Sequence, residues 1–260
     1  MKTVITKLVK GNMLEDKLET ESNKDLFIVS GANGNLGKSY VSYIKNNLSC
    51  DVISLSRLEL DLLDYDSCKK YISDVDLSEY KNIVYVHPVG KFSFERFGVQ
   101  VDENCDGIDD NVFSSNVITF TNFVSCLKDK LSDKQSLTCV AFGSVSDKYN
   151  IRYWLSYTKS KNVLREKLYK SSNDASGFSS VFVNVSTVDT GNENKLRPNP
   201  LDKKNWLTTD EVVTCSMPYI LTCCGYVEID VYKKVSGFSD DFYTNDVGVL
   251  SRWELQMGNK

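Results

Sequence analysis

The sequence predicts a single α/β domain, a doubly wound parallel sheet with helices on both faces. Short runs of apolar and β-branched residues recur along the 260-residue chain, and amphipathic helical patterns separate them. Uninterrupted apolar runs of this length are typical of strands that are buried on both faces. Strands that alternate with helices indicate a parallel sheet, and the length fits one large domain.

Six such runs are expected to form the strands. They are LFIVSG at 26–31, VISLS at 52–56, IVYVH at 83–87, LTCVAFG at 137–143, VFVNVS at 181–186 and YVEIDV at 226–231. Helical spacing of apolar residues is clearest in two stretches, at Leu36, Tyr40, Val41, Ile44 and Leu48, and at Val112, Phe120, Phe123, Val124 and Leu127.

The ends of the chain are expected to lie outside this domain, which covers residues 25–232. Residues 1–24 are polar and charged and form an N-terminal extension, and residues 233–260 form a Gly-, Ser- and Asp-rich C-terminal tail. Inside the domain, residues 187–207 are long for a connection and hold two of the four prolines. Because long loops in compact domains are usually functional or disordered, we expect a substrate loop there.

Composition excludes several classes of protein. A formal net charge of -4 without a basic face argues against nucleic-acid binding. The N-terminus lacks the apolar core of a signal peptide, and no stretch reaches the roughly 18 apolar residues of a membrane span, so we expect a cytoplasmic protein. Eight cysteines without a C-x-x-C pair, and a single histidine, predict no metal site and no disulfide framework.

The first apolar run leads directly into a glycine-rich turn, GANGNLG at 31–37, and then into the first helix. Glycines allow a tight turn and a close approach of backbone to pyrophosphate, and the helix N-terminus offers free N–H groups to an anion. Alone, this spacing also fits an ordinary Gly- and Asn-rich turn. Its position at the first strand–helix junction favours a dinucleotide cradle, formed by Gly31, Asn33, Gly34, Asn35, Leu36 and Gly37.

The end of the second run bears on the choice of cofactor. An acidic residue there would accept from the 2′-hydroxyl of NAD, whereas an arginine accommodates the phosphate of NADP. The run ends in Ser56-Arg57, which can donate to and pair with that phosphate, so NADP(H) is favoured over NAD(H). Glu59 is the counter-evidence, because a shift of two residues would place an acid at the site.

Asp61 and Leu62 follow, and we expect both to bind the cofactor. The Asp61 carboxylate can accept from the adenine amino group, while the role of helix cap is assigned to Asp64 or Asp66.

The catalytic candidates form a triplet near the middle of the chain. Tyr157 follows Ser144 by thirteen residues, and Lys161 is four residues further on, so the phenol and the ammonium share one helix face. Tyrosine has a reference pKa of about 10, and a nearby ammonium can lower it by about 1 to 3 units. Tyr157 can then protonate a carbonyl oxygen that Ser144 binds, with Ser146 as the alternative serine.

Together these features resemble the short-chain dehydrogenase/reductase family in its single-domain form. The resemblance covers roughly residues 25–231 and rests on the turn at 31–37, Asp61, Ser144, the segment 157–161, Thr190 and a final strand that begins at Gly225. It implies a Rossmann-type fold and assembly as a homodimer or homotetramer through helices around 110–130 and 155–170.

The same resemblance implies roles for single residues. Tyr157 would be the proton donor and would lie at the cofactor, and Lys161 would also bind the nicotinamide ribose. Asn116 would hold a water of the proton relay, with Asn111 as a competitor. Val188 and Thr190 would contact the nicotinamide carboxamide.

Three departures from the family pattern stand out. His87-Pro88-Val89-Gly90 replaces an Asn-Asn-Ala-Gly-like segment; this places His87 near the cofactor by position, although a packed strand-end residue is the favoured interpretation. Asn35 occupies the position of the middle glycine in the family's glycine motif, and Ser186-Thr187 replaces the Pro-Gly that usually follows the sixth strand.

The expected function is NADPH-dependent reduction of a carbonyl to an alcohol on a small polar substrate. Lys195, Arg197, Lys203 and Lys204 lie within ten residues of an otherwise acidic protein, which suggests a phosphorylated or sugar-type substrate, although a solvated polar loop explains them equally well. Two alternatives remain open: a sugar-nucleotide epimerase or dehydratase with retained NAD, and a non-catalytic cofactor-binding regulator.

Overall fold

The computed structural model describes residues 4–11, 24–93, 95, 101–148, 154–174, 177–191 and 203–233. Within this part of the chain, a seven-stranded sheet has the order β1-β7-β6-β5-β4-β2-β3. The strands are β1 (Val4–Lys10), β2 (Lys24–Ser30), β3 (Asp51–Leu55), β4 (Tyr80–His87), β5 (Ser136–Ser144), β6 (Phe178–Val185) and β7 (Tyr226–Lys233). Strands β2 to β7 are parallel, so the predicted doubly wound α/β fold is confirmed.

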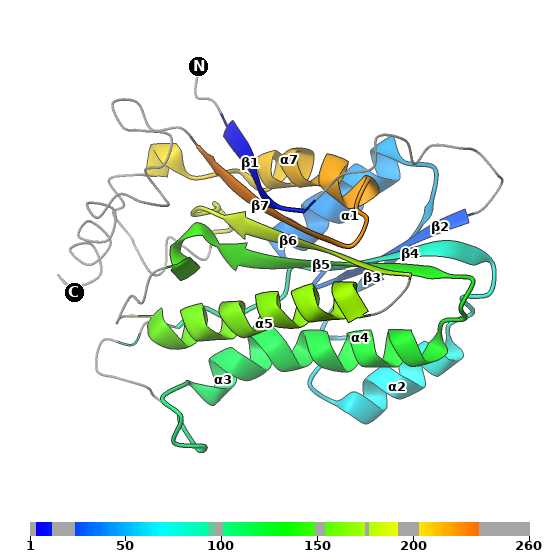
Figure 1. The fold of residues 1–260 in the computed structure, drawn as a ribbon, viewed down its shortest axis with the longest axis horizontal. Coiled ribbons are helices and arrows are strands. Elements are labelled where there is room, and N and C mark those ends of the chain that lie inside the picture. Colours follow the sequence, from blue (N-terminus) through cyan, green and yellow to red (C-terminus); the bar gives the residue numbers. More distant parts are fainter. Residues whose placement is uncertain are drawn as a thin grey trace.

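Helices cover both faces of the sheet (Figure 1). On one face lie α1 (Asn35–Asn47) and α7 (Thr209–Leu221). On the other lie α2 (Tyr65–Asp74), α3 (Asp110–Phe113), α4 (Thr119–Lys130) and α5 (Leu155–Asp174), with a π-helical turn η1 (Ser114–Ile118) that joins α3 to α4. Short 3₁₀ turns, η2 (Val145–Lys148) and η4 (Lys203–Asn205), follow β5 and precede α7.

The core consists of two apolar layers, one on each face of the sheet. Alternate residues of β2 separate between them: Leu26 and Ile28 pack towards α2, α4 and α5, whereas Phe27 and Val29 pack towards α1 and α7. This is why the strand has an uninterrupted apolar sequence, since both of its faces are buried. No helix in the described ranges is both long and apolar enough to cross a membrane.

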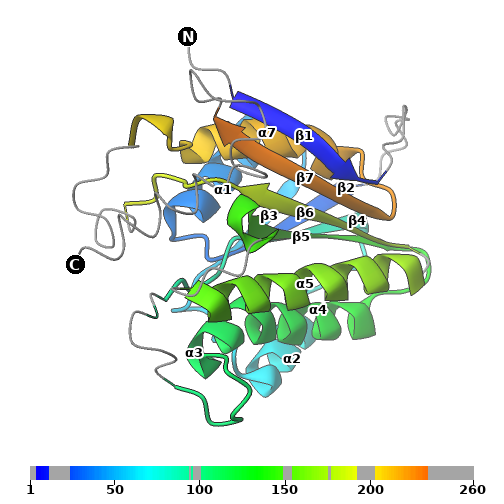
Figure 2. The same ribbon diagram turned by 60° about the vertical axis from the view of Figure 1, so that its left-hand side comes forward.

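The prediction that residues 1–24 lie outside the core is wrong for residues 4–10. They form β1, which pairs antiparallel with β7 and completes that edge of the sheet (Figure 2). A strand at an open edge leaves a row of N–H and C=O groups without partners, and β1 supplies those partners to β7. Lys10 then lies 3.5 Å above the ring of Tyr169 on α5, which fixes the end of β1.

Candidate functional site

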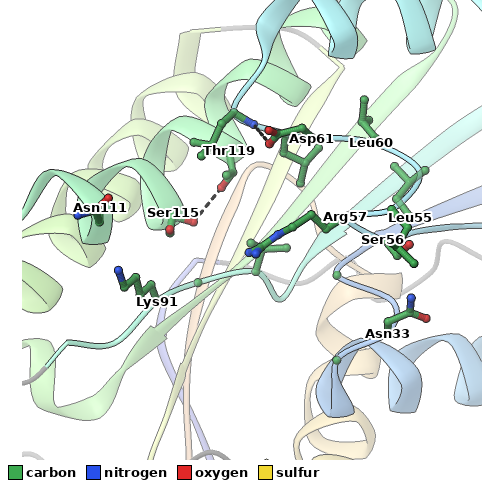
Figure 3. Close-up of a pocket in the computed structure, with 17 residues that line it drawn as sticks. Asn33, Leu55, Ser56, Arg57, Leu60, Asp61, Lys91, Asn111, Ser115 and Thr119 are labelled. Atoms are coloured by element: carbon green, nitrogen blue, oxygen red, sulfur yellow. Dashed lines mark hydrogen bonds between the residues drawn. The ribbon is translucent and has the colours of Figure 1, made fainter.

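A pocket of about 750 Å³ opens at the carboxyl ends of β2, β3 and β4 (Figure 3). Its walls come from the glycine turn, the segments after β3 and β4, and the α3–α4 region. The lining residues are Gly31, Asn33, Gly34, Leu55, Ser56, Arg57, Leu58, Leu60, Asp61, Leu62, Leu63, Val89, Gly90, Lys91, Asn111, Ser115 and Thr119. Since β3 and β4 lie on opposite sides of β2, the pocket is at the point where strand order reverses, the usual ligand site of such sheets.

The glycine turn is packed too tightly for larger residues. Gly31 has a φ of +60°, and its carbonyl oxygen accepts a hydrogen bond of 2.9 Å from the Gly34 N–H. A Cβ atom at Gly37 would lie 2.3 Å from the same carbonyl oxygen, so α1 could not stay against the turn. Within the described residues, the first turn of α1 has neither a side-chain cap nor an acidic residue, which leaves its N–H groups for an anion.

Asn35 ties this turn to the segment after β6. Its Nδ2 donates to the Thr190 carbonyl oxygen at 2.6 Å. Val188 is buried and bridges to Leu207, so the described part of the 187–207 loop, residues 187–191 and 203–207, is held beside the sheet. Thr190 and Val188 do not line the pocket described above, and residues 192–202, with Lys195 and Arg197, lie outside the described residues.

The cofactor-selecting residues predicted after β3 face the pocket. Arg57 projects into it in Figure 3, whereas the Glu59 carboxylate turns back and accepts from the Ser56 N–H at 2.6 Å. Hydrogen bonds from Ser56 lower the pKa of Glu59. Asp61 lines the pocket and accepts from the Leu63 N–H at 3.0 Å.

Asp64 is the N-cap of α2, where its side chain accepts from the Asp66 and Ser67 N–H groups. Of the two residues predicted for this role, the structure therefore selects Asp64.

The predicted triplet comes from two adjacent elements. Ser144 is the last residue of β5, and Tyr157 and Lys161 lie one turn apart on α5, with the Lys161 Nζ 5.5 Å from the Tyr157 ring centroid. Lys161 is only 4% exposed. Burial lowers its pKa to about 8, and the Asp147 carboxylate opposes that shift.

Gly90 links the triplet to the pocket. A Cβ atom there would lie 2.7 Å from Asn116 Oδ1 and 3.1 Å from Lys161 Nζ, so both groups are directly behind this wall residue. Asn116 holds the wall in place: its Oδ1 accepts from the Lys91 N–H at 2.8 Å and its Nδ2 donates to the Lys91 carbonyl oxygen at 3.0 Å. The competing residue, Asn111, lines the pocket instead.

Asn116 also reaches α5, the helix that carries Tyr157 and Lys161. Its Nδ2 donates to Ser160 Oγ at 2.9 Å, and that hydroxyl donates to the Tyr157 carbonyl oxygen at 2.7 Å. Asn116 therefore connects the segment after β4 with the turn of α5 that carries Tyr157 and Lys161.

The structure places the His87 side chain in the core, behind the pocket rather than among its lining residues. Its Nδ1 lies 2.8 Å from Ser30 Oγ and 2.7 Å from the Tyr85 hydroxyl, and its Nε2 lies 3.2 Å from Thr119 Oγ1. Burial, together with the charge of Lys161, lowers the pKa of His87 to about 3. The imidazole is therefore neutral at physiological pH.

Sequence reasoning missed several polar residues around this site, among them Ser115 and Thr119 of the pocket lining. Lys91 lines the pocket, and Asp147 and Arg165 lie next to the triplet. Arg165 follows Lys161 by four residues, so its place on the same helix face could have been inferred. No sequence spacing pointed to Asp147, because its partners Ser144 and Arg165 come close to each other only in the folded chain.

The sheet order, the two helical layers and the pocket at the strand-order reversal define a Rossmann-type α/β fold. More particularly, it is the fold of the short-chain dehydrogenases/reductases. The structure of Thermoplasma acidophilum aldohexose dehydrogenase in ligand-free form matches this chain with a TM-score of 0.59 and 14% identity, over 79% of this chain and 93% of that one.

Two further solved structures carry nucleotides. A short-chain dehydrogenase/reductase from Burkholderia phymatum in complex with NAD has a TM-score of 0.59 and 14% identity, over 81% of this chain and 90% of that one. A Shigella flexneri protein assigned to the short-chain dehydrogenases and complexed with NADP matches this chain with a TM-score of 0.62 and 14% identity, over 80% of this chain and 97% of that one. No family model and no curated protein matches this sequence. At such identities, the likeness establishes the fold alone.

Proposed function

We propose that this protein is an NAD(P)-dependent oxidoreductase that reduces a carbonyl to an alcohol. The observation that carries the proposal is the contact at Gly90: the Lys161 ammonium lies directly behind a wall residue of the pocket. A dinucleotide-sized cavity and a tyrosine–lysine pair thus share one boundary. This is the arrangement that hydride transfer coupled to proton transfer needs.

The residues present fit a nicotinamide dinucleotide. The close approach of Gly37 to Gly31 brings the uncapped N-terminus of α1 to the pocket, where it would hold the pyrophosphate. Asp61 and Leu62, which line the pocket, would contact the adenine. Lys161, next to the wall residue Gly90, would contact the ribose beside the nicotinamide. When bound, the nicotinamide ring would supply the hydride for the carbonyl carbon.

Residues of the chain itself would transfer the proton that the carbonyl oxygen needs. The Tyr157 hydroxyl gives its proton to the carbonyl oxygen while the Ser144 hydroxyl binds that oxygen. Lys161, 5.5 Å from the Tyr157 ring centroid, stabilises the phenolate that remains. Asn116 holds the pocket wall and α5 in a fixed relative position, because it binds Lys91 in the wall and Ser160 on the helix.

Turnover by this site can be tested with one substitution. A panel of carbonyl sugars and acyl ketones would be screened for NADPH oxidation, and Tyr157→Phe should lower the rate by about 10²- to 10⁴-fold while sparing NADPH binding. Tyr169→Phe, on the same helix and 38% exposed, is the matched control and should keep full activity. Retained turnover in Tyr157→Phe would falsify the assignment.

Two observations support NADP(H) over NAD(H). Arg57 projects into the pocket, and Lys91 is a second cation in its lining. Glu59 is bound to the Ser56 N–H and does not line the pocket. Arg57→Ala should weaken NADPH binding by about 10- to 100-fold, the cost of a charge-assisted hydrogen bond, and change NADH binding less than twofold.

Fluorescence titration of both nucleotides is the measurement, with Glu59→Gln as the control for the local fold. Wild-type protein that binds NADH more tightly than NADPH would contradict the preference. Copurified NAD that survives dialysis would favour the epimerase or dehydratase class instead.

For the substrate, we propose a small polar carbonyl compound of phosphorylated or sugar type. An aldohexose dehydrogenase is among the proteins with this fold, so sugars are included among the substrates to be tested. Lys203 lies 3.9 Å from the Asp189 carboxylate, so part of the loop charge is paired within the loop itself. If the loop binds an anion, Lys203→Ala with Lys204→Ala should raise KM for a phosphorylated substrate; an unchanged KM would refute the phosphorylated class.

We also propose a cytoplasmic homodimer or homotetramer. The helices expected at the interface, α4 and α5, lie side by side on one face of the sheet (Figure 2). Light scattering after size-exclusion chromatography would show the mass, and a monomer at micromolar concentration would exclude the assembly.

A further inference from the structure

A buried network of charged and amide side chains lies between α5 and strands β6 and β7. Arg165, on α5, donates from Nε to Glu228 at 3.0 Å and from Nη2 to Asn184 at 3.0 Å. Asn184 donates in turn to Glu228 at 2.8 Å. The Arg165 guanidinium also lies 4.7 Å from the Phe182 ring centroid. Such a network orients side chains well only when its polar atoms have partners, as they do here.

One carboxylate extends this network to the catalytic candidates. The Asp147 side chain is fully buried, and its Oδ1 accepts from Arg165 Nη2 at 2.6 Å. Its other oxygen, Oδ2, accepts from the Ser144 N–H at 3.1 Å. Asn162, the residue after Lys161, donates to the Asp147 carbonyl oxygen at 3.3 Å. Asp147 therefore joins the end of β5, where Ser144 lies, to the helix that carries Lys161.

The spacing along α5 makes this connection specific. Arg165 is four residues after Lys161, so the two cations occupy the same face of the helix. A buried ammonium needs a compensating negative charge. Asp147 and Glu228 are both paired with Arg165, and Asp147 is the group that raises the pKa of Lys161 against the effect of burial.

We propose that Asp147 is a positioning residue for the proton-transfer site: it locks Ser144 to α5 through Arg165 and supplies a buried negative charge next to the turn of α5 that carries Lys161. This inference rests on the proposed function, because it assigns Asp147 a role toward Ser144 and Lys161 as catalytic groups. The other groups that face Lys161 are the Tyr157 ring, Asn116 and the buried His87. None of them is an anion in the neutral range unless Tyr157 ionises.

The decisive measurement is the pKa of Lys161 in the full-length protein, which needs no substrate. NMR of protein labelled at the lysine side chains would follow the titration, and Lys161→Gln would assign the signal. Asp147→Asn keeps the shape and removes the charge, so the pKa of Lys161 should fall by about 1 unit or more. Glu211→Gln, which breaks the ion pair with Lys233 on the opposite face, is the matched control and should leave this pKa unchanged.

The results separate this inference from the proposed function. An unchanged Lys161 pKa in folded Asp147→Asn overturns the positioning role. A lowered pKa with no carbonyl reduction by any variant supports the electrostatic role and overturns only the enzymatic assignment. Where activity is found, Asp147→Asn should lower kcat at least tenfold and shift its alkaline limb to lower pH, with NADPH affinity within twofold of wild type.

A second measurement covers the case in which Asp147→Asn does not fold, since the substitution removes one of the two carboxylates that are paired with the largely buried Arg165. In the wild-type protein, the hydrogen bond to Asp147 should slow hydrogen exchange of the Ser144 amide by about 100-fold or more relative to an unprotected chain. Exchange of that amide at the unprotected rate would overturn the inference.

Discussion

Acid should destabilise this protein through its only histidine. His87 is neutral in the folded state because burial lowers its pKa to about 3, whereas an unfolded histidine has a pKa of 6.5. Between these values the unfolded chain binds the extra proton, so the free energy of unfolding falls as pH falls below 6.5. We predict that His87→Asn, which cannot titrate and keeps an amide near the Nδ1 position, removes this loss.

The size of the effect follows from the two pKa values. Each unit of pH below 6.5 costs about 1.4 kcal/mol, so wild type should lose about 2 kcal/mol between pH 7 and pH 5 that the variant does not lose. The full difference, reached near pH 3, is about 5 kcal/mol. Lys161 does not interfere, because its pKa of about 8 keeps it protonated in both states below pH 7.

The assay is urea unfolding of wild type and His87→Asn at pH 7, 6 and 5. Since the sequence has one histidine, its imidazole gives a single set of NMR signals that can be followed in the folded protein. These signals should not titrate between pH 8 and 5. A folded-state titration near pH 6.5, or equal losses of stability in the two proteins, would refute the reasoning.

Three further substitutions test the geometry of the site and its support. Gly37→Ala places a methyl 2.3 Å from the Gly31 carbonyl oxygen and should lower the free energy of unfolding by about 1–3 kcal/mol, measured in urea, and weaken NADPH binding; wild-type stability would show that the contact is not there. Gly90→Ala directs a methyl at Asn116 Oδ1 and Lys161 Nζ and should lower turnover by about 10²-fold with a smaller effect on NADPH affinity; the reverse pattern would contradict the placement. Thr208→Ala removes the capping box of α7 and should cost about 1 kcal/mol of thermal or urea stability, whereas Thr208→Ser should restore it.

The parts of the fold that depend on local sequence could be predicted. Each of the six apolar runs forms a strand. The glycine turn at 31–37 lies between β2 and α1, and the apolar pattern of each of these elements was clear in the sequence. The strand β1 was missed because its last four residues are exposed and its partner is more than 200 residues away. Pairing over such a distance leaves no periodic trace in a short edge strand, where Val4, Ile5, Leu8 and Val9 do not alternate with polar residues.

The direction in which a side chain points was the second feature that could not be predicted from the sequence. The sequence placed His87 at the end of a strand near the cofactor, but not whether its ring faces the pocket or the core. Asp147 illustrates the same limit, since its oxygens bind a backbone N–H on β5 and a guanidinium on α5. Spacing along the chain could order Ser144, Tyr157 and Lys161, but not find the carboxylate between them.

The antiparallel pairing of β1 with β7 has a consequence for biosynthesis. Val4 pairs with Lys233, so the first described strand emerges from the ribosome long before its partner exists. Until then, β1 is an unsatisfied strand with exposed Leu8 and Val9, the kind of segment that pairs with other chains. Lys7 and Lys10 add charge to it and oppose such pairing. The edge of the sheet should therefore be the last part of this fold to form, after the pocket at the carboxyl ends of β2, β3 and β4 is complete.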